Sequence, residues 1–240
     1  MALQMKTLRE AIESRRPKIS IYGESSTGKT TQIAAIWALL GEDESMLILT
    51  AEHGLRSLRK RCPEMMDDPR VMVGECHTVG DVKEGVAMAS NPSNGIAWCV
   101  VDSVSNIADR ELRARLESAG DPRQAYGAMQ SATLGVLWQL VDVAAIGVLF
   151  IFQEVRTEVN EGTAKKPEMV NYYGPAVPSK ALQQSMPYIF DAVLRLEMTP
   201  GGDRQIRTAK TRTITAKDRT GKLDAMEPCD LGAIVAKIID

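Results

Sequence analysis

The chain has 240 residues, of which 44% are hydrophobic and 25% charged, and its formal net charge is −2. These values are typical of a globular protein and exclude a disordered or fibrous one. No apolar run approaches the roughly 18 residues that span a bilayer, and the first residues do not resemble a signal segment, so we expect a cytoplasmic protein with no membrane partner. The four cysteines are scattered and lack the spacing of a zinc site, so we expect them to be reduced.

Helical and strand-like patterns alternate through much of the chain. Helical spacing recurs over residues 80–89 and over a long stretch that ends at Ala145. Strand-like apolar runs cover residues 18–22, 46–51, 71–73, 95–102 and 147–153. This alternation predicts an α/β fold with a mostly parallel central sheet, right-handed crossovers and helices on both faces. We expect one domain over residues 1–240, with an N-terminal helix within residues 1–17.

The pattern changes in the last third of the chain. Residues 156–180 lack clean periodicity and contain several glycines and prolines, so we expect a mobile loop there. Residues 191–198 and 205–217 alternate with period two around a Pro-Gly-Gly-Asp turn, which predicts a β-hairpin over 191–217. A short helix over residues 231–239 is expected to close the fold. Charge is uneven here, because residues 204–222 contain seven basic residues and one acid.

Residues 23–30 read GESSTGKT and match the phosphate-binding pattern G-x-x-x-x-G-K-[ST]. A strand-like run precedes the pattern and helical spacing follows it, as that loop requires. Backbone N–H groups of such a loop cradle phosphates, the lysine reaches the β- and γ-phosphates, and the hydroxyl of the last residue ligates Mg²⁺. No Asn-Lys-x-Asp motif for guanine follows, so we expect ATP and Mg²⁺ as ligands. The predicted nucleotide-binding residues are Gly23, Glu24, Ser25, Ser26, Thr27, Gly28, Lys29, Thr30 and Thr31.

Hydrolysis needs a metal anchor and a group that activates water, and both are expected at the ends of neighbouring strands. Asp102 ends the run 95–102, where its carboxylate would hold Mg²⁺ together with Thr30. The next residue is Ser103 rather than a second acid, so the catalytic carboxylate must come from elsewhere. Glu52, at the end of the run 46–51, is the candidate. A third strand ends in Gln153, whose amide can hydrogen-bond the γ-phosphate.

Four segments resemble the RecA family in the same order: residues 23–31, 50–55, 100–104 and 150–156. The resemblance covers about residues 19–217 and implies a RecA-type P-loop ATPase core in which Glu52 activates the attacking water. The compact size resembles small phage-encoded RecA-like ATPases of single-strand annealing and recombination, which would act in the host cytoplasm.

The chain departs from that family pattern in two places. Phe-Gln-Glu-Val-Arg stands where RecA proteins carry Asn-Gln-Ile-Arg, so Gln153 and Glu154 compete for the sensor role. We favour Gln153, because an acid facing the γ-phosphate would be repelled. Where family members often place an aromatic residue against adenine, this chain offers Arg56, Arg59 and Lys60.

The segment Lys217-Asp218-Arg219-Thr220-Gly221 is similar to the Lys-x-Arg-x-Gly element of RecA-like ring helicases. That resemblance implies that Lys217 and Arg219 reach the γ-phosphate bound by a neighbouring copy of the chain. Cations of this kind stabilise the charge of the transferring phosphoryl group. Hydrolysis would then depend on assembly into a filament or a ring.

Residues 156–180 stand where RecA-like proteins have a DNA-contacting loop. Cations interleaved with aromatic residues are what single-stranded DNA binding requires, and a mobile lid is the alternative. The predicted DNA-binding residues are Arg156, Lys165, Lys166, Tyr172 and Tyr173. A second basic stretch, residues 110–123, is better interpreted as a solvent-facing helix with pairs such as Glu111–Arg115.

We therefore expect an ATPase, stimulated by single-stranded DNA, that acts in DNA recombination, repair or strand annealing and hydrolyses ATP between protomers. A single-stranded DNA-binding protein is a further expected partner. Two alternatives stay open: a RecA-type ring helicase motor or loader, and a nucleotide-gated assembly protein with little turnover.

Overall fold

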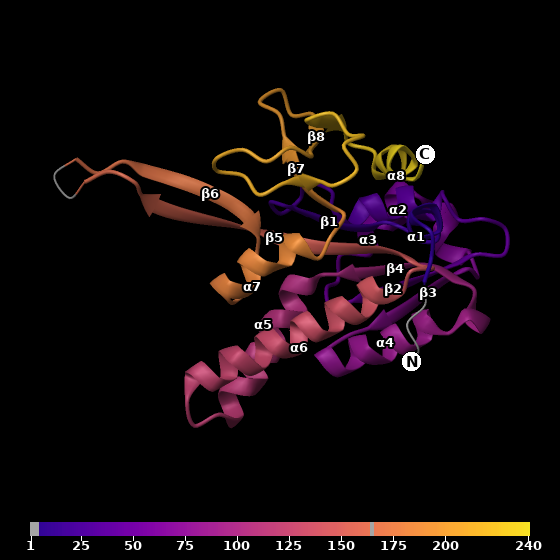
Figure 1. Cartoon of the computed structure of the whole chain (residues 1–240), viewed down its shortest axis with the longest axis horizontal. Helices are drawn as coiled ribbons and strands as arrows, with labels where there is room; N and C mark the ends of the chain where they lie inside the picture. The colour runs from indigo at the N-terminus through magenta and orange to yellow at the C-terminus, as the bar shows by residue number, and fades with distance from the viewer. Residues whose placement is uncertain (1–4, 164–165) are drawn as a thin grey trace.

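The computed structural model describes residues 5–163 and 166–240 and is built around a ten-stranded sheet (Figure 1). The strand order is β10-β8-β7-β1-β5-β4-β2-β3, with β6 also beside β5 and β9 also beside β7. The strands that run from β7 to β3 in this order pair in parallel. They are β1 (Lys18–Gly23), β2 (Ser45–Thr50), β3 (Val71–Glu75), β4 (Ile96–Asp102), β5 (Gly147–Asn160) and β7 (Ala192–Met198). The predicted α/β fold with a mostly parallel sheet is confirmed.

Helices cover both faces of the sheet, because its central strands are apolar on both sides. Every residue of β1 and β4 is buried. On one face lie α4 (Val79–Ser90), α5 (Val104–Ser118), α6 (Pro122–Asp142) and α7 (Lys180–Ser185). On the other lie α2 (Ile33–Trp37), α3 (Arg56–Arg61) and α8 (Leu231–Ile239). Of the expected N-terminal helix, the structure has α1 (Leu8–Glu13), which buries no residue. None of the described helices has the length and apolar character that crossing a bilayer would require.

The register of the parallel strands brings the chemically interesting residues to one edge of the sheet. Gly23, at the end of β1, pairs with Gln153 on β5. Asp102, at the end of β4, pairs with Thr50 on β2 and with Ile151 on β5. Because carboxyl ends of parallel strands share an edge, residues far apart in sequence meet there.

The prediction of an irregular loop over residues 156–180 is wrong. Strand β5 continues to Asn160 and pairs antiparallel with β6 (Met169–Pro175), so that the two strands form an arm that projects from the body of the molecule (Figure 1). β-Branched residues at alternate positions, Val155, Thr157 and Val159, favour this extended conformation. Gly162 and Pro167 belong to the end of the arm, and the segment's other glycine and prolines and its lack of clean periodicity also suggested a loop.

The hairpin predicted over residues 191–217 forms only in part. Strand β7 is followed by β8 (Arg204–Arg207), which pairs with it antiparallel but is far shorter than the run 205–217 suggested. The chain then leaves the sheet edge, because backbone groups of Thr213 and Thr215 bond to those of Tyr173 at 2.8 and 3.0 Å. Two more short strands return to the sheet: β9 (Lys217–Asp218) on β7 and β10 (Met226–Pro228) on β8.

The basic stretch 110–123 falls on α5 and the start of α6, as the helical interpretation predicts. The ion pair between Glu111 and Arg115 is present, with 2.8 Å between Oε1 and Nη2. A second i,i+4 pair joins Asp109 to Arg113 at 2.7 Å.

Candidate active site

The phosphate-binding loop leaves the end of β1 and leads through a 3₁₀ turn, Thr30–Gln32, into α2. Gly28 has a φ of +102°, a conformation that a side chain would strain, and Ser26 also has a positive φ of 65°. The Thr27 hydroxyl donates to the Glu24 carbonyl at 2.9 Å and fixes the shape of the loop. The ammonium of Lys29 donates to the carbonyls of Gly23 and Glu24 at 2.8 and 2.7 Å. Its only hydrogen bonds among the described residues are thus to neutral acceptors, which a phosphate can replace.

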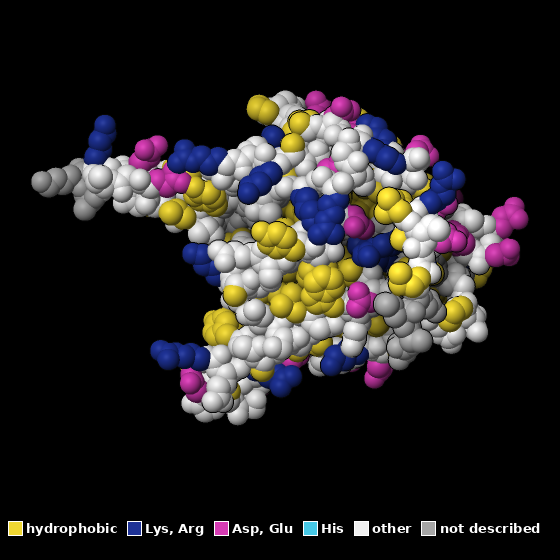
Figure 2. Space-filling model, viewed as in Figure 1, with side chains coloured by type: hydrophobic (Ala, Val, Ile, Leu, Met, Phe, Trp, Pro, Cys, Tyr) yellow, Lys and Arg dark blue, Asp and Glu magenta, His cyan; other side chains and the backbone are white. Residues whose placement is uncertain are grey.

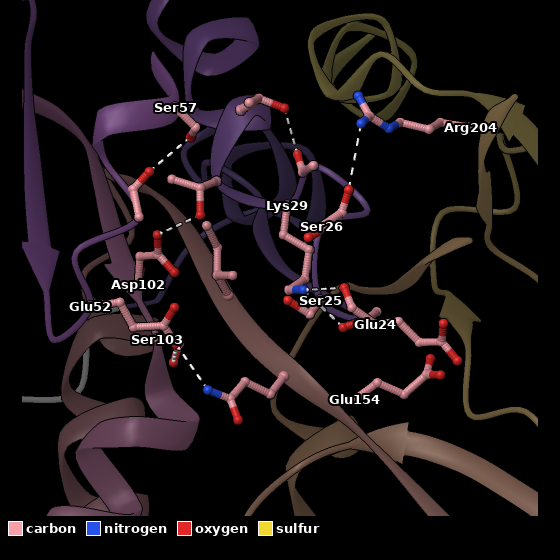
Figure 3. Close-up of a pocket in the computed structure, with 17 residues that line it drawn as sticks. Glu24, Ser25, Ser26, Lys29, Glu52, Ser57, Asp102, Ser103, Glu154 and Arg204 are labelled. Carbon is pink, nitrogen blue, oxygen red and sulfur yellow. Dashed lines mark hydrogen bonds between the residues drawn. The ribbon is translucent and has the colours of Figure 1, made fainter. Parts of the chain in front are cut away.

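A pocket of about 680 Å³ opens over this loop (Figure 3). The phosphate-binding loop forms one wall, and residues from the ends of β2, β4 and β5 form another. In Figure 3, Glu52, Asp102 and Ser103 lie together on the side of the pocket opposite Arg204. The sequence-predicted residues Lys29, Thr30, Glu52, Asp102 and Gln153 all line this pocket.

Thr30 and Asp102, the two residues predicted to hold Mg²⁺, are in contact. The Thr30 hydroxyl donates to Asp102 Oδ2 at 3.0 Å, and Asp102 is 1% exposed. Burial raises the pKa of Asp102 to about 6, and the nearby charge of Glu52 adds to the effect. A hydroxyl and a carboxylate in contact are hard oxygen ligands of the kind that Mg²⁺ takes together with water and phosphate oxygens. These two residues therefore fit Mg²⁺.

Glu52 lies just beyond β2 and is held by hydrogen bonds from two other strand ends. Its Oε1 accepts from the hydroxyl of Ser103 and from Nε2 of Gln153, the latter at 3.1 Å. In the sequence, Ser103 is notable only because it stands where a second acid could follow Asp102. The structure shows that this serine orients the carboxylate supplied by β2, and its position directly after Asp102 was the only signal in the sequence.

Gln153 and Glu154 point to different partners. The Gln153 amide contacts Glu52 and also donates to Asn106 Oδ1 at 3.0 Å. Glu154 is bound by the guanidinium of Arg195, at 2.7 Å from Nε and 3.1 Å from Nη2, and its side chain is 4% exposed. Because that carboxylate is already neutralised by an arginine, Gln153 is the residue of the two whose polar group faces Glu52.

Arg110 of α5 holds the backbone next to Glu52 by hydrogen bonds. Its Nη2 donates to the Ala51 carbonyl at 3.0 Å, and its Nη1 donates to the Cys76 carbonyl at 3.1 Å. These bonds join the ends of β2 and β3. This arginine of the second basic stretch thus has a structural task next to the site.

The structure does not bring Lys217 and Arg219 to this pocket. Strand β9 pairs with the amino end of β7, where Ala192 lies opposite Asp218, at the edge of the sheet away from the phosphate-binding loop. The Lys217 ammonium donates to the carbonyls of Pro187 and Phe190 at 2.8 and 2.7 Å. Burial, with a contribution from Arg219, lowers the pKa of Lys217 to about 8. Arg219 is about half exposed, at 49%, and donates to the Tyr188 carbonyl at 2.6 Å.

The predicted DNA-binding residues lie on or near the arm formed by β5 and β6. Arg156 and Lys166 are exposed, whereas Lys165 lies outside the described residues. Tyr172 pairs with Thr157 and Tyr173 with Arg156, so the two tyrosines point to opposite faces of the arm. The Tyr173 ring lies 4.5 Å from the Arg195 guanidinium at the base of the arm. Only one of the two tyrosines can therefore belong to a given stacking surface.

The region expected to contact adenine is only partly at the pocket. Arg56, Arg59 and Lys60 lie exposed on α3, and the pocket is lined there by Gly54 and Ser57 instead. Arg204, which the sequence offered only as one member of a basic segment, does line the pocket.

Comparison with a family model covers most of the chain. Residues 15–220 match a family model described as an AAA domain. No curated protein matches the chain.

Solved structures of other proteins are similar to the chain, and two of them serve as examples. A RadB recombinase is 20% identical, with a TM-score of 0.49 over 83% of this chain and 84% of that one. The KaiC-like protein PH0186 from Pyrococcus horikoshii OT3 is 15% identical, with a TM-score of 0.50 over 82% of this chain and 80% of that one. At such identities the likeness concerns the fold. The chain therefore belongs to the AAA domain family, and it shares its fold with the KaiC-like protein.

Proposed function

We propose that the protein hydrolyses ATP with Mg²⁺ in the pocket above the phosphate-binding loop. The observation that carries this proposal is the meeting of four groups from three segments: the Lys29 ammonium, the Thr30–Asp102 pair and the Glu52 carboxylate (Figure 3). A phosphate-binding loop alone holds a nucleotide. A carboxylate on the other side of the same pocket can also accept a proton from the attacking water.

Each residue has one task in this mechanism. The N–H groups of the loop bind the phosphates, and Lys29 leaves its carbonyl partners for phosphate oxygens. Thr30 and Asp102 hold Mg²⁺, which neutralises phosphate charge when bound. Glu52 accepts the proton of the water whose oxygen attacks the γ-phosphorus, while the bond to the ADP oxygen breaks. Gln153 orients the water or the γ-phosphate with its amide, and Ser103 keeps Glu52 in place.

The substitution Glu52→Gln tests this assignment. It preserves size and hydrogen bonding but removes the base, so we expect ATP binding to persist while kcat falls by about 10²–10⁴-fold, the usual contribution of a general base. Glu84→Gln is the matched control, because Glu84 is an exposed residue of α4 outside the pocket. Unchanged hydrolysis in Glu52→Gln would remove this residue from the mechanism.

The finer part of the proposal is that turnover is coupled to single-stranded DNA in recombination or strand annealing. The arm supports it: it projects from the body and exposes Arg156 and Lys166. Figure 2 shows basic side chains along the arm, interspersed with acidic and hydrophobic ones. The ATPase rate should rise when single-stranded DNA is added, with particle size followed by light scattering.

Assembly of several copies is the last part of the proposal. Lys217 and Arg219 lie at the far edge of the sheet from their own phosphate-binding loop, so any contact they make with a γ-phosphate is with that of another copy. Of the two, Arg219 is the more exposed. Directional unwinding of duplex DNA would instead favour a ring motor. Negligible turnover with nucleotide-dependent assembly would favour a nucleotide-gated binding protein.

A further inference from the structure

Arg204 is a cation of the pocket that the mechanism above does not use. It is the first residue of β8 and pairs with Met198, the last residue of β7. Since β7 runs parallel to β1, this pair lies at the edge of the sheet where the phosphate-binding loop begins. The Arg204 side chain extends toward the loop, and its Nη2 lies 3.5 Å from the Ser26 carbonyl (Figure 3).

The guanidinium lies against the outer turn of the loop, the part made of residues 26–28. A Cβ built on Gly28 would stand 3.3 Å from Arg204 Nη1 and 3.1 Å from the Thr31 hydroxyl. A glycine at this position therefore leaves the space through which the arginine approaches the loop backbone. The contact joins residues 178 positions apart and depends on the order of the strands.

The charge of Arg204 has no counterpart in the part of the chain that the structure describes. Within 4.0 Å of its guanidinium there is no described carboxylate, and its hydrogen bond to Ser26 is at the long limit for such a bond. Two neighbouring arginines differ in this respect: Arg207 pairs with Glu197 at 2.9 Å, and Arg195 pairs with Glu154 at 2.7 Å. Arg204 is thus a cation beside an anion-binding loop and is not neutralised by a described acid.

The position along the loop indicates which phosphates the cation would meet. The glycine-rich turn of such a loop cradles the α- and β-phosphates, while its lysine and threonine serve the γ-phosphate and the metal. Glu52 and Gln153, at the γ-phosphate end, line the other side of the pocket. Arg204 is at the turn, and its planar fork can bind two phosphate oxygens at once.

We propose that Arg204 binds the α- and β-phosphates of the nucleotide held by the phosphate-binding loop of its own chain. The proposal rests on the proposed nucleotide binding and adds a residue to it. Since ATP and ADP share these two phosphates, Arg204 sets the affinity for substrate and product alike. Arg204 takes no part in the chemical step, for which Glu52 is the base.

The test is a set of dissociation constants for Mg-ADP and Mg-ATP, measured by calorimetry on the full chain. We expect Arg204→Ala to weaken both ligands by the same factor, about tenfold, as is usual for a hydrogen-bonded charge on phosphate. Arg204→Lys keeps the charge without the fork and should fall between the wild type and Arg204→Ala. Lys210→Ala, which removes an exposed cation six residues along the same segment, should change neither constant. ATP is measured in the Glu52→Gln background to prevent turnover.

Three results would overturn the inference. Unchanged affinities in Arg204→Ala would show that the arginine does not contact the nucleotide. If Arg204→Ala lost affinity for ATP but not for ADP, Arg204 would contact the γ-phosphate instead. If Lys210→Ala lost as much affinity as Arg204→Ala, the effect would come from the net charge of the protein and not from a contact. The variant Lys29→Ala distinguishes a failure of the Arg204 inference from a failure of the proposed nucleotide site. If Lys29→Ala also left ADP binding intact, the proposed nucleotide site would be wrong.

Discussion

The buried carboxyl group of Asp102 connects the metal site to the stability of the protein. A carboxylate that is 1% exposed loses most of its hydration, and the negative charge of Glu52 adds to the cost of ionising it. The pKa of Asp102 is therefore raised, to about 6 from 3.8. In the proposed role, a bound Mg²⁺ would remove this cost.

Because ionised Asp102 is destabilised by burial, we expect Asp102→Asn to stabilise the metal-free protein. A raised pKa in the folded state gives stability that is present below the unfolded pKa and is lost as pH rises through the folded pKa. At pH 7.5 the variant should gain roughly 3 kcal/mol in free energy of unfolding, at about 1.4 kcal/mol per pKa unit. The gain should shrink as pH falls from about 6 to about 4. Urea unfolding across this range measures it.

Magnesium reverses the comparison for the same residue. Adding Mg-ATP should stabilise the wild type more than Asp102→Asn, because the variant keeps the phosphate-binding loop but lacks the charge of the metal ligand. A wild type that is more stable than Asp102→Asn without metal at neutral pH would contradict the assigned pKa shift.

At the scale of elements, the arm is the part of the structure whose role depends most on its strand pairing. Successive side chains of a strand face opposite sides, so the register assigns Arg156 and Tyr173 to one face and Thr157 and Tyr172 to the other. Tyr173 packs against Arg195, which also binds Glu154 next to Gln153. Arg195 of β7 thus contacts both strands of the arm at its base, next to the proposed sensor Gln153.

The arm also yields a prediction for DNA binding. Reversing two of its exposed charges, Arg156→Glu with Lys166→Glu, should weaken single-stranded DNA binding by more than about tenfold and flatten its salt dependence, since each lost phosphate contact lowers the slope by about 0.7. ATP binding without DNA should not change. Lys83→Glu on α4 is the control, and fluorescence anisotropy over a salt series is the measurement. Equal salt slopes for the wild type and the double variant would exclude the arm from the DNA contact.

At the scale of the whole molecule, Lys29 of the phosphate-binding loop lies at the carboxyl ends of the parallel strands, and Lys217 and Arg219 lie near their amino ends. The phosphate-binding loop follows the carboxyl end of β1, and Arg219 follows a strand that pairs near the amino end of β7. From Ile19 to Gly23 alone, β1 spans about 13 Å, at about 3.3 Å per residue. A single copy cannot place both groups on one γ-phosphate, which is why the proposed site needs two.

Mixing two inactive variants tests this arrangement. Lys29→Ala lacks the cradle and Arg219→Ala lacks the cation supplied to the neighbour, so each should lose ATPase activity alone. In an equimolar mixture, about a quarter of randomly formed interfaces combine an intact loop with an intact Arg219, and activity should return to about that fraction. Light scattering with ATP should show particles larger than the monomer. No recovery in the mixture, or full activity of Arg219→Ala alone, would contradict a shared site.

Several parts of the fold and site could be predicted from the sequence because their signals are local. The loop 23–30 is contiguous, and the buried strands contain uninterrupted apolar runs such as residues 96–101 and 148–152. Glu52 and Asp102 could be found because Glu52 directly follows such a run and Asp102 ends another. The arm was missed because glycine and proline near its end resemble loop residues, and β8 was overextended because Thr-rich alternation continues after the chain leaves the sheet.

The sequence by itself determined the phosphate-binding loop, the parallel α/β core and the carboxylates at its strand ends, since each depends on neighbouring residues and on the burial of apolar runs. The tertiary structure alone decided which distant groups meet: Ser103 with Glu52, Arg195 with Glu154, and Arg204 with the loop 178 positions away. The physical reason is that these contacts follow from strand order and register. Both are set by how the whole sheet packs between its two layers of helices, and no local segment encodes them.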